Sequence, residues 1–285
     1  MDRPPSSAIA RQTPRLSVEP FTSAAELLHR NNRVDFLALP AQDSDRYLAG
    51  FAVSDKAIDE ALRLRYEVFN LELGEGLAES STTGLDRDRF DDQMTHLALM
   101  ERLTGRIVGT YRVQTIHQAL DAHGIYSAQE YVMDALEPIL DRSVELGRAC
   151  LALEHRTFPA IFALWLGIGA FMNAFEQQYL FGCCSLTTQN PDDGWRAMKT
   201  IRAKNYLHPE LFVPATASYR CGPSEREHDP DLGAPLALPK LFRTYMRLGV
   251  KVVSEPALDR EFGTVDFLVL LDGYKVSLSR LDILK

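Results

Sequence analysis

The sequence SVELGRACLAL at positions 143–153 predicts a central strand that is broken in its middle. Strict alternation along a strand would direct Glu145 and Arg148 to opposite faces of a sheet. Gly147 lies between them, and glycine tolerates the positive φ that a β-bulge can require. With a bulge, both charged side chains can face one site; without one, they are an exposed acid and an exposed base on two faces. This stretch therefore decides whether the sheet carries a charged centre.

An uncharged helix is predicted directly after this strand, at residues 158–175, FPAIFALWLGIGAFMNAF. Its length is at the lower limit for a membrane-spanning helix. Pro159 suits the first turn of a helix, and Gly167, Gly169 and Asn173 weaken the hydrophobicity that lipid would require. We interpret the segment as a buried core helix, and a membrane-embedded element is the alternative.

The segments around this centre predict the rest of one sheet. Residues 95–101 and 106–114 are strands joined by a tight turn at 103–105, so they should pair antiparallel. The other predicted elements are a short helix near 23–31, a strand at 47–54, a helix from Asp55, as its N-cap, to about Leu73, mixed helical or irregular chain at 116–141, a strand at 180–187, helices at 192–205 and 238–248, and strands at 251–254 and 265–272. Together they predict an α+β fold in which helices flank one mixed, mostly antiparallel central sheet.

The composition is that of a globular protein. The 285 residues are 46% hydrophobic, and the formal net charge of -8 argues against nucleic-acid binding, which needs a dense basic surface. The four cysteines form no CxxC pair and have no metal-type spacing with histidine, so we expect neither a disulfide framework nor a metal site. Residues 1–20 lack the apolar stretch of a secretory signal. We expect a flexible tail at 1–21, a single domain at 22–285 and a cytoplasmic location.

A positive charge interrupts the apolar face of the first long helix. Ile58, Leu62, Arg65 and Phe69 follow the spacing of one helix face. The guanidinium of Arg65 must either extend to solvent or be paired, because an unpaired buried charge costs several kcal/mol.

Acidic partners for this arginine follow soon after, in the run DRDRFDD at 86–92. An aromatic residue, Phe90, within so charged a run indicates that the loop folds back onto apolar surface. On the next strand, Arg112 shares a face with Val108 and Thr110, and it can point into the same pocket. Taken alone, such a run is more typical of a solvated loop.

The order of these motifs resembles one branch of a known superfamily. The motifs are RYEVF at 65–69, DRFD at 88–91, VGTYR at 108–112, ELGR at 145–148, LWLGI at 164–168, FGCCSL at 181–186, YMRLG at 245–249 and VDFLV at 265–269. This combination is similar to the acyl-carrier-protein-dependent branch of the GNAT superfamily, over roughly residues 50–272. That branch contains the ornithine lipid N-acyltransferases, often labelled hemolysin-like, the N-acyl amino acid synthases and the acyl-homoserine-lactone synthases.

Two departures narrow the resemblance. Homoserine-lactone synthases generally carry a tryptophan shortly after the first helix, where this chain has residues 71–73, LEL, so that activity is the alternative rather than the expectation. Acetyl-CoA enzymes carry a glycine-containing pyrophosphate loop, but residues 156–160, RTFPA, contain no glycine. Arg156 and the following helix N-terminus could still bind the single phosphate of phosphopantetheine. The expected donor is therefore acyl carrier protein, as an acyl-phosphopantetheine thioester, with no other cofactor.

The resemblance implies transfer of a fatty, optionally 3-hydroxylated, acyl group to the amino group of an amino acid such as ornithine. Glu145 is the expected general base, because an ammonium acceptor must lose a proton before it attacks a thioester. The backbone at Gly147 is expected to stabilise the oxyanion. The remaining expected site residues are Arg112 and Arg148 in catalysis, and Arg65, Phe69, Asp88, Asp91, Arg156 and Trp165 in substrate binding. Cysteine catalysis is not expected, because an amine attacks a thioester directly.

A basic helix face is the expected docking site for the acidic carrier protein. Lys240, Arg243 and Arg247 follow i, i+3, i+7 spacing, and residues 196–202 carry a second basic face. Either face can simply be solvated, or the first can rest peripherally on the inner membrane surface. The rival from a different class is a non-catalytic, membrane-interacting protein of the hemolysin-like kind that embeds residues 158–175.

Overall fold

The computed structural model describes residues 36–39 and 45–275. The predicted tail at 1–21 and the predicted helix at 23–31 lie outside the described residues.

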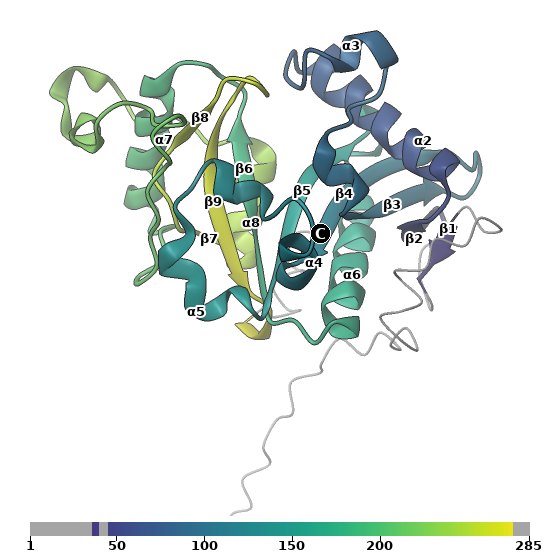
Figure 1. Ribbon diagram of the computed structural model, residues 1–285. Helices are drawn as coiled ribbons and strands as arrows, with labels where there is room; N and C mark the ends of the chain where they lie inside the picture. Colours follow the sequence, from purple (N-terminus) through teal and green to yellow (C-terminus); the bar gives the residue numbers. More distant parts are fainter. Residues whose placement is uncertain (1–35, 40–44, 276–285) are drawn as a thin grey trace, which may run out of the picture.

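One nine-stranded sheet forms the centre of the described chain, in the order β1-β2-β3-β4-β5-β6-β9-β7, with β8 paired to β9 (Figure 1). Every pairing is antiparallel except that of β5 with β6, which confirms the predicted mixed, mostly antiparallel sheet. The strands are β1 (Phe36–Ala38), β2 (Tyr47–Ala52), β3 (Thr95–Glu101), β4 (Ile107–Thr115), β5 (Ser143–Leu151), β6 (Tyr179–Leu186), β7 (Lys251–Val252), β8 (Ala257–Asp259) and β9 (Thr264–Asp272). The strands β1 and β8 were not predicted, and β7 is half as long as predicted.

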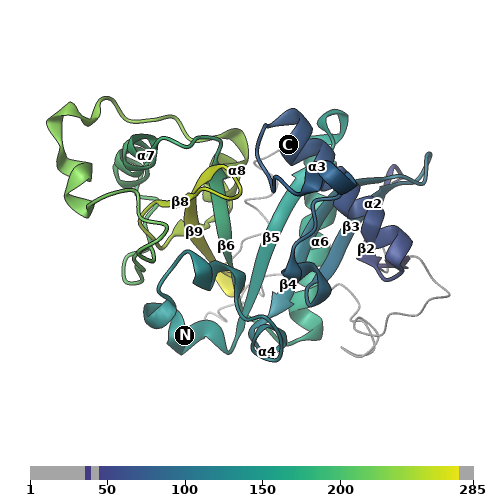
Figure 2. The same cartoon turned by 45° about the horizontal axis from the view of Figure 1, so that its top comes forward.

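The helices lie on both faces of this sheet (Figures 1 and 2). The α-helices are α2 (Asp55–Tyr66), α3 (Ser80–Thr83), α4 (Ile116–Leu120), α5 (Glu137–Leu140), α6 (Phe158–Ala174), α7 (Pro191–Ala203) and α8 (Lys240–Leu248). A π-helix, η1 (Glu67–Glu72), continues α2, and the 3-10 turns are η2 (Arg89–Asp92), η3 (Tyr126–Gln129), η4 (Met133–Leu136), η5 (Leu153–His155), η6 (Ser224–His228), η7 (Pro230–Leu232) and η8 (Gly273–Lys275).

The start of the first long helix differs by one residue from the prediction. Ser54 rather than Asp55 is the N-cap of α2, because the Ser54 hydroxyl accepts a hydrogen bond from the backbone N–H of Ala57 at 3.2 Å. Asp55 occupies the first turn, where its negative charge interacts favourably with the positive end of the helix dipole.

The uncharged helix α6 packs on the sheet against β2, β3 and β4. Gly167 permits this close approach, since a β-carbon there would lie 2.4 Å from a methyl carbon of Leu97 on β3. No helix in the described part of the chain is long and apolar enough to cross a membrane. The prediction of a core helix is confirmed.

The parallel pairing of β5 with β6 is short. Only Ser143, Val144 and Glu145 of β5 pair with β6, through Tyr179, Leu180 and Phe181. The backbones stay in contact at the next position, where a β-carbon on Gly182 would lie 2.2 Å from the carbonyl oxygen of Leu146. Beyond this point no further pair joins the two described strands, so the sheet splits into a β1–β5 half and a β6–β9 half (Figure 2).

Candidate active site

A cavity of about 510 Å³ occupies the split between the two halves of the sheet. Its lining includes Leu146 to Leu151 of β5 and Leu180 to Ser185 of β6. Neighbouring residues of a strand face opposite sides, so the presence of both Cys183 and Cys184 in the lining shows that the cavity reaches both faces of the sheet. The helices α6 and α8 form one side of the cavity. This side is largely apolar and includes Ile161, Leu164, Trp165, Phe242 and Tyr245. The other side carries the polar residues Glu75, Tyr126, Arg148, Cys183 and Asp266.

A bulge, one of the two alternatives that the sequence left open, is present in β5 beside this cavity. Thr110 and Arg112 of β4 are two residues apart, whereas their partners Cys150 and Gly147 are three residues apart. The residue with positive φ is Arg148, at 49°, and not Gly147 as the sequence analysis suggested. An αL conformation costs a non-glycine residue about 1–3 kcal/mol, and ion pairs hold the Arg148 side chain in place. Gly147 serves a different purpose, because its missing β-carbon leaves space for Arg112, whose Nε would otherwise lie 3.3 Å away.

Arg65 is fully buried and paired, as one of the two alternatives predicted. Its Nε donates to Asp86 at 2.7 Å, and its two terminal nitrogens donate to the two carboxylate oxygens of Asp91 at 2.6 and 3.1 Å. Burial alone would raise the pKa of Asp91, but the adjacent guanidinium groups of Arg65 and Arg112 hold it well below its usual range. Extension of Arg65 to solvent is excluded.

Asp88 joins the other two arginines of this network. Its carboxylate accepts from Arg112 at 2.6 Å and from Arg148 at 3.1 Å, and it also caps the turn η2 by accepting from the backbone N–H of Phe90 at 2.8 Å. Phe90 is buried against Tyr126, with ring centroids 5.2 Å apart, so the loop folds back as predicted. Three arginines and three aspartates thus balance in charge within one buried network.

The predicted site residues divide into two groups. The residues that line the cavity are Phe69, Gly147, Arg148, Arg156, Trp165 and Lys240. The lining, taken over the described residues, does not include Arg65, Asp88, Asp91, Arg112, Glu145, Arg243 or Arg247. Direct contact of the first four with substrate is therefore not supported, because their charges are satisfied by each other beneath the bulge.

Glu145 has a geometry unlike that of a general base. Its carboxylate accepts four hydrogen bonds, which come from Gln114 at 2.7 Å, the backbone N–H of Tyr126 at 3.0 Å, and both the backbone N–H and the hydroxyl of Ser127 at 2.7 Å. A fully hydrogen-bonded carboxylate outside the cavity lining is poorly placed to accept a proton from a substrate. It fixes η3 to the central strand instead.

Arg156 already has a partner at the cavity wall. Its terminal nitrogens form a bidentate pair with Glu72, both at 2.6 Å, and its Nε donates to the carbonyl of Leu151 at 3.0 Å. The side chain is about one third exposed, so it remains accessible to an anion at the N-terminus of α6.

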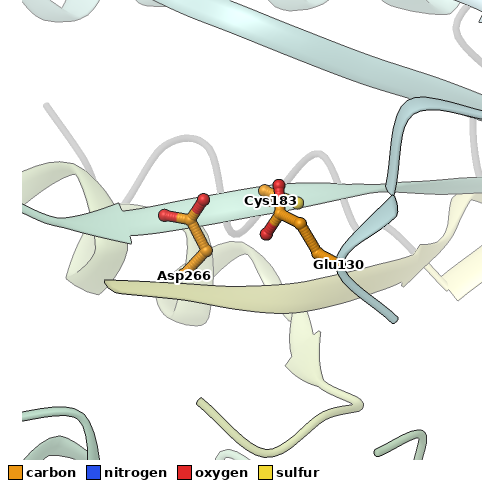
Figure 3. Close-up of side chains that lie close together, drawn as sticks. All are labelled: Glu130, Cys183 and Asp266. Carbon is orange, nitrogen blue, oxygen red and sulfur yellow. The ribbon is translucent and has the colours of Figure 1, made fainter. Parts of the chain in front are cut away.

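Three residues that were not predicted as site residues come together at the polar side of the cavity. Glu130, Cys183 and Asp266 place one ligand-type atom each within 4.8 Å of one another, and Figure 3 shows their side chains converging from separate segments. Burial raises the pKa of Asp266 to about 6, and burial together with the charge of Asp266 raises the pKa of Glu130 well above its usual range. The sequence signal for Asp266 is its position as an acid within the apolar run TVDFLVLLD at 264–272. Arg65 interrupts the apolar face of its helix in the same way.

The thiols near the cavity are poor nucleophiles. Burial raises the pKa of Cys150 to about 12, and burial also raises the pKa of Cys183 well above its usual range. A nucleophilic cysteine needs a lowered pKa, so this environment favours direct attack by an acceptor. Burial likewise lowers the pKa of His96 to about 4, and its Nε2 lies 3.1 Å from the carbonyl oxygen of Asp91.

Comparison with known proteins gives consistent matches. Residues 64–166 match the family model described as an acetyltransferase (GNAT) domain. An L-ornithine N(alpha)-acyltransferase of Rhizobium meliloti (strain 1021) is 32% identical over 260 residues, which cover 85% of this chain and 86% of that protein. The protein of the same name from Agrobacterium fabrum (strain C58 / ATCC 33970) is 31% identical, with 77% and 78% covered. Among solved structures, FeeM, an N-acyl amino acid synthase from uncultured soil microbes, matches at 13% identity and a TM-score of 0.46, over 81% of this chain and 92% of that chain.

Proposed function

Because the chain belongs to the GNAT acyltransferase family that includes the L-ornithine N(alpha)-acyltransferases, and is therefore an acyltransferase, we propose that it transfers a fatty acyl group from acyl carrier protein to the amino group of an amino acid such as ornithine. The observation that carries the proposal is a cavity through the split sheet that is apolar toward α6 and α8 and polar toward Asp266 and Arg148. Such a cavity suits an acyl chain on one side and a charged acceptor on the other.

The thioester is proposed to lie where β5 and β6 separate. Past Glu145, the edge of β5 that faces β6 has no ladder partner in the described chain, so its backbone can hydrogen-bond the amides of a phosphopantetheine arm as an added strand would. Backbone N–H groups at the Gly147 and Arg148 bulge then lie beside the thioester and can stabilise the oxyanion of the tetrahedral intermediate.

Arg148 is proposed to receive the carboxylate of the acceptor, since it is the network arginine in the cavity lining. Arg65, Arg112, Asp88 and Asp91 act through it by holding the bulge and its loop in place. The shape of the polar side thus depends on a network that does not itself touch substrate.

The basic face of α8 is the proposed docking site for the carrier protein. Lys240, Arg243 and Arg247 are exposed, and Lys240 also lies at the cavity wall, where an acyl chain delivered by the carrier would enter. The competing face on α7 is less suitable, because Arg196 and Arg202 already pair with Asp193 and Glu227. Leu241, exposed on α8, makes the same face compatible with peripheral contact at an anionic membrane surface.

The decisive experiment is acyl transfer by the purified protein, followed by mass spectrometry. We expect an N-acyl amino acid from acyl carrier protein and L-ornithine, with lower kcat/KM when acyl-CoA replaces the carrier protein. An acylated lactone formed from S-adenosylmethionine would instead establish the homoserine-lactone synthase activity. Absence of any acylated amine with L-ornithine, L-lysine or glycine would overturn the proposal.

Carrier-protein docking has its own test. The double variant R243E/R247E should raise KM for the acyl-carrier-protein donor at least about tenfold, because charge complementarity controls association. Its kcat/KM for an acyl-pantetheine donor should not change. The matched control K204E/R220E reverses two exposed basic residues elsewhere and should behave like the unmodified protein. Equal effects of the two double variants would contradict docking on α8.

A further inference from the structure

We propose that Glu130 and Asp266 form the binding site for the acceptor's primary ammonium group, and that Asp266 takes the proton from it. The inference rests on the proposed acyl transfer and adds to it the residues that prepare the nucleophile. It replaces the role expected of Glu145.

The two carboxyl groups come from segments far apart in the sequence. Asp266 lies on β9 opposite Ser185 of β6, Cys183 lies on the same face of β6, and Glu130 follows the turn η3. Figure 3 shows the Glu130 side chain extending from its loop toward Cys183, with Asp266 beside it. The split sheet and the turn that Glu145 anchors are therefore both needed to assemble the pair.

The pair lacks hydrogen-bond donors that would satisfy it. In the described chain, both oxygens of Glu130 and the Oδ1 of Asp266 have no hydrogen-bond partner, although the two residues are only 1% and 4% exposed. A buried polar group left unsatisfied typically costs about 1–3 kcal/mol. Glu145, buried nearby, accepts four hydrogen bonds. A ligand that brings several donors would remove this cost, and an ammonium group brings three.

The pair is open to substrate through the cavity. Asp266 and Cys183 belong to its lining, together with Arg148 and Tyr126 on the same polar side. Glu130 is outside that lining, with a carboxylate oxygen within 4.8 Å of the carboxylate of Asp266 and of the Cys183 sulfur. Asp266 is thus the carboxyl that a substrate in the split would meet, with Arg148 available for the carboxylate of the same amino acid.

The charge of the pair matches a single cation. Two carboxyl groups so close do not ionise independently. Burial and the charge of Asp266 raise the pKa of Glu130 well above its usual range, which favours its neutral form, whereas Asp266, with a pKa of about 6, is ionised at neutral pH. A base with a pKa just below the working pH is well matched to proton transfer. The other groups that influence the pKa of Asp266 are the carboxylate of Asp259 on β8, which raises it, and the nearby side chains of Ser185 and Thr264, which lower it; the Cys183 thiol adjoins Glu130.

The chemical step balances without any further reagent. Asp266 removes one proton from the acceptor ammonium, and the nitrogen lone pair attacks the thioester carbonyl. The carbon–sulfur bond of the tetrahedral intermediate breaks, the thiolate leaves and takes a proton from the acylated nitrogen, and an amide and a thiol result. Asp266 then returns its proton to solvent.

A divalent metal ion is the competing occupant of the same three side chains. Cys183 is a poor metal ligand here because burial raises the pKa of its thiol well above the usual range, and burial likewise raises the pKa of Glu130, which favours the neutral carboxyl over the metal-binding carboxylate. Two ligands that resist deprotonation favour an ammonium group over a dication.

The test compares D266N with E130Q in acyl transfer to L-ornithine. D266N should lower kcat/KM by about 10² to 10⁴, the range for loss of a general base, and should abolish the rise in kcat/KM through pH 6 that we expect of the unmodified protein. E130Q should stay within about tenfold, because the glutamine keeps the size of the side chain and an acceptor oxygen for the ammonium group. The control E261Q, an exposed acid on the turn before β9, should have no effect. Full activity of D266N overturns the inference while leaving the acyltransferase itself established.

Calorimetric binding of L-ornithine and methylamine tests the site without turnover. The unmodified protein should bind L-ornithine at pH 7.5, and D266N should bind it at least about tenfold more weakly. If the unmodified protein binds neither amine, or if Zn²⁺ binds stoichiometrically and both D266N and E130Q abolish it, the ammonium site is wrong. Amine binding without acylation would retain the site and refute only the proposed reaction.

Discussion

Replacement of Arg65 by methionine tests whether the buried charge network holds the fold around the cavity. Methionine keeps much of the side-chain volume but removes three hydrogen bonds, to Asp86 and Asp91. Breaking a buried ion pair by removing one partner usually costs about 3–5 kcal/mol. We expect the lower end, about 3 kcal/mol, since Arg148 and Arg112 still lie 3.3 Å from these two acids.

The loss can be measured by urea unfolding. With a slope of about 3 kcal/mol per molar urea, a loss of about 3 kcal/mol lowers the transition midpoint by about 1 M. The matched control is R87M, which breaks a pair with Asp59 of the same chemistry and a 2.7 Å distance, but with both side chains 45% exposed. An exposed pair contributes at most about 1 kcal/mol.

The outcome that would refute this reasoning is a similar, small cost for both variants. It would show that burial does not make the Arg65 network indispensable. The acyltransferase activity of R65M at low urea concentration is a second test of the structural role, because Arg65 does not line the cavity. The activity of R65M per folded molecule should fall only to the extent that the loss of Arg65 displaces the bulge at Arg148.

Three further predictions concern the site. D266N should be more stable than the unmodified protein by about 3 kcal/mol at pH 8 and indistinguishable from it below pH 4. Burial raises the pKa of Asp266 to about 6, so the unmodified folded state loses stability as the pH rises from about 4 to 6. Thermal melts across this pH range would contradict the prediction if the difference in stability were constant. E145Q should lose about 1–3 kcal/mol in urea unfolding, since its amide would face the donors of Tyr126 and Ser127, and an unchanged midpoint would show that Glu145 does not anchor η3. G182A should cost at least about 1–3 kcal/mol, because its β-carbon would lie 2.2 Å from a backbone oxygen, and a normal melting temperature would mean that the split can widen freely.

Local patterns determined much of the fold. The hairpin of β3 and β4 and the helix α6 lie where alternation and apolar composition predicted them, because each pattern reports which face of an element is buried. The short strands β1 and β8, of three residues each, were missed, since so few residues carry no detectable periodicity.

The charged network was also accessible to sequence reasoning. Arg65 within an apolar helix face had to be paired or exposed, and the acids at 86–92 were the nearest partners. Gly147 pointed to a bulge, although the structure places the positive φ on Arg148. Arg65 and Gly147 each differ from the pattern of the residues around them, and this difference identified them in the sequence.

The tertiary structure alone decided which charged residues meet the cavity. Glu145 and Asp266 are both buried acids on strands, but a turn supplies four hydrogen bonds to the first, while the split leaves the second in the cavity lining beside Glu130. The sequence by itself placed acids and arginines within apolar strands and helices, where each had to be either paired or extended to solvent. It could not determine which acid would be left without donors, because that depends on the register of β6 with β9 and on a turn more than a hundred residues from β9.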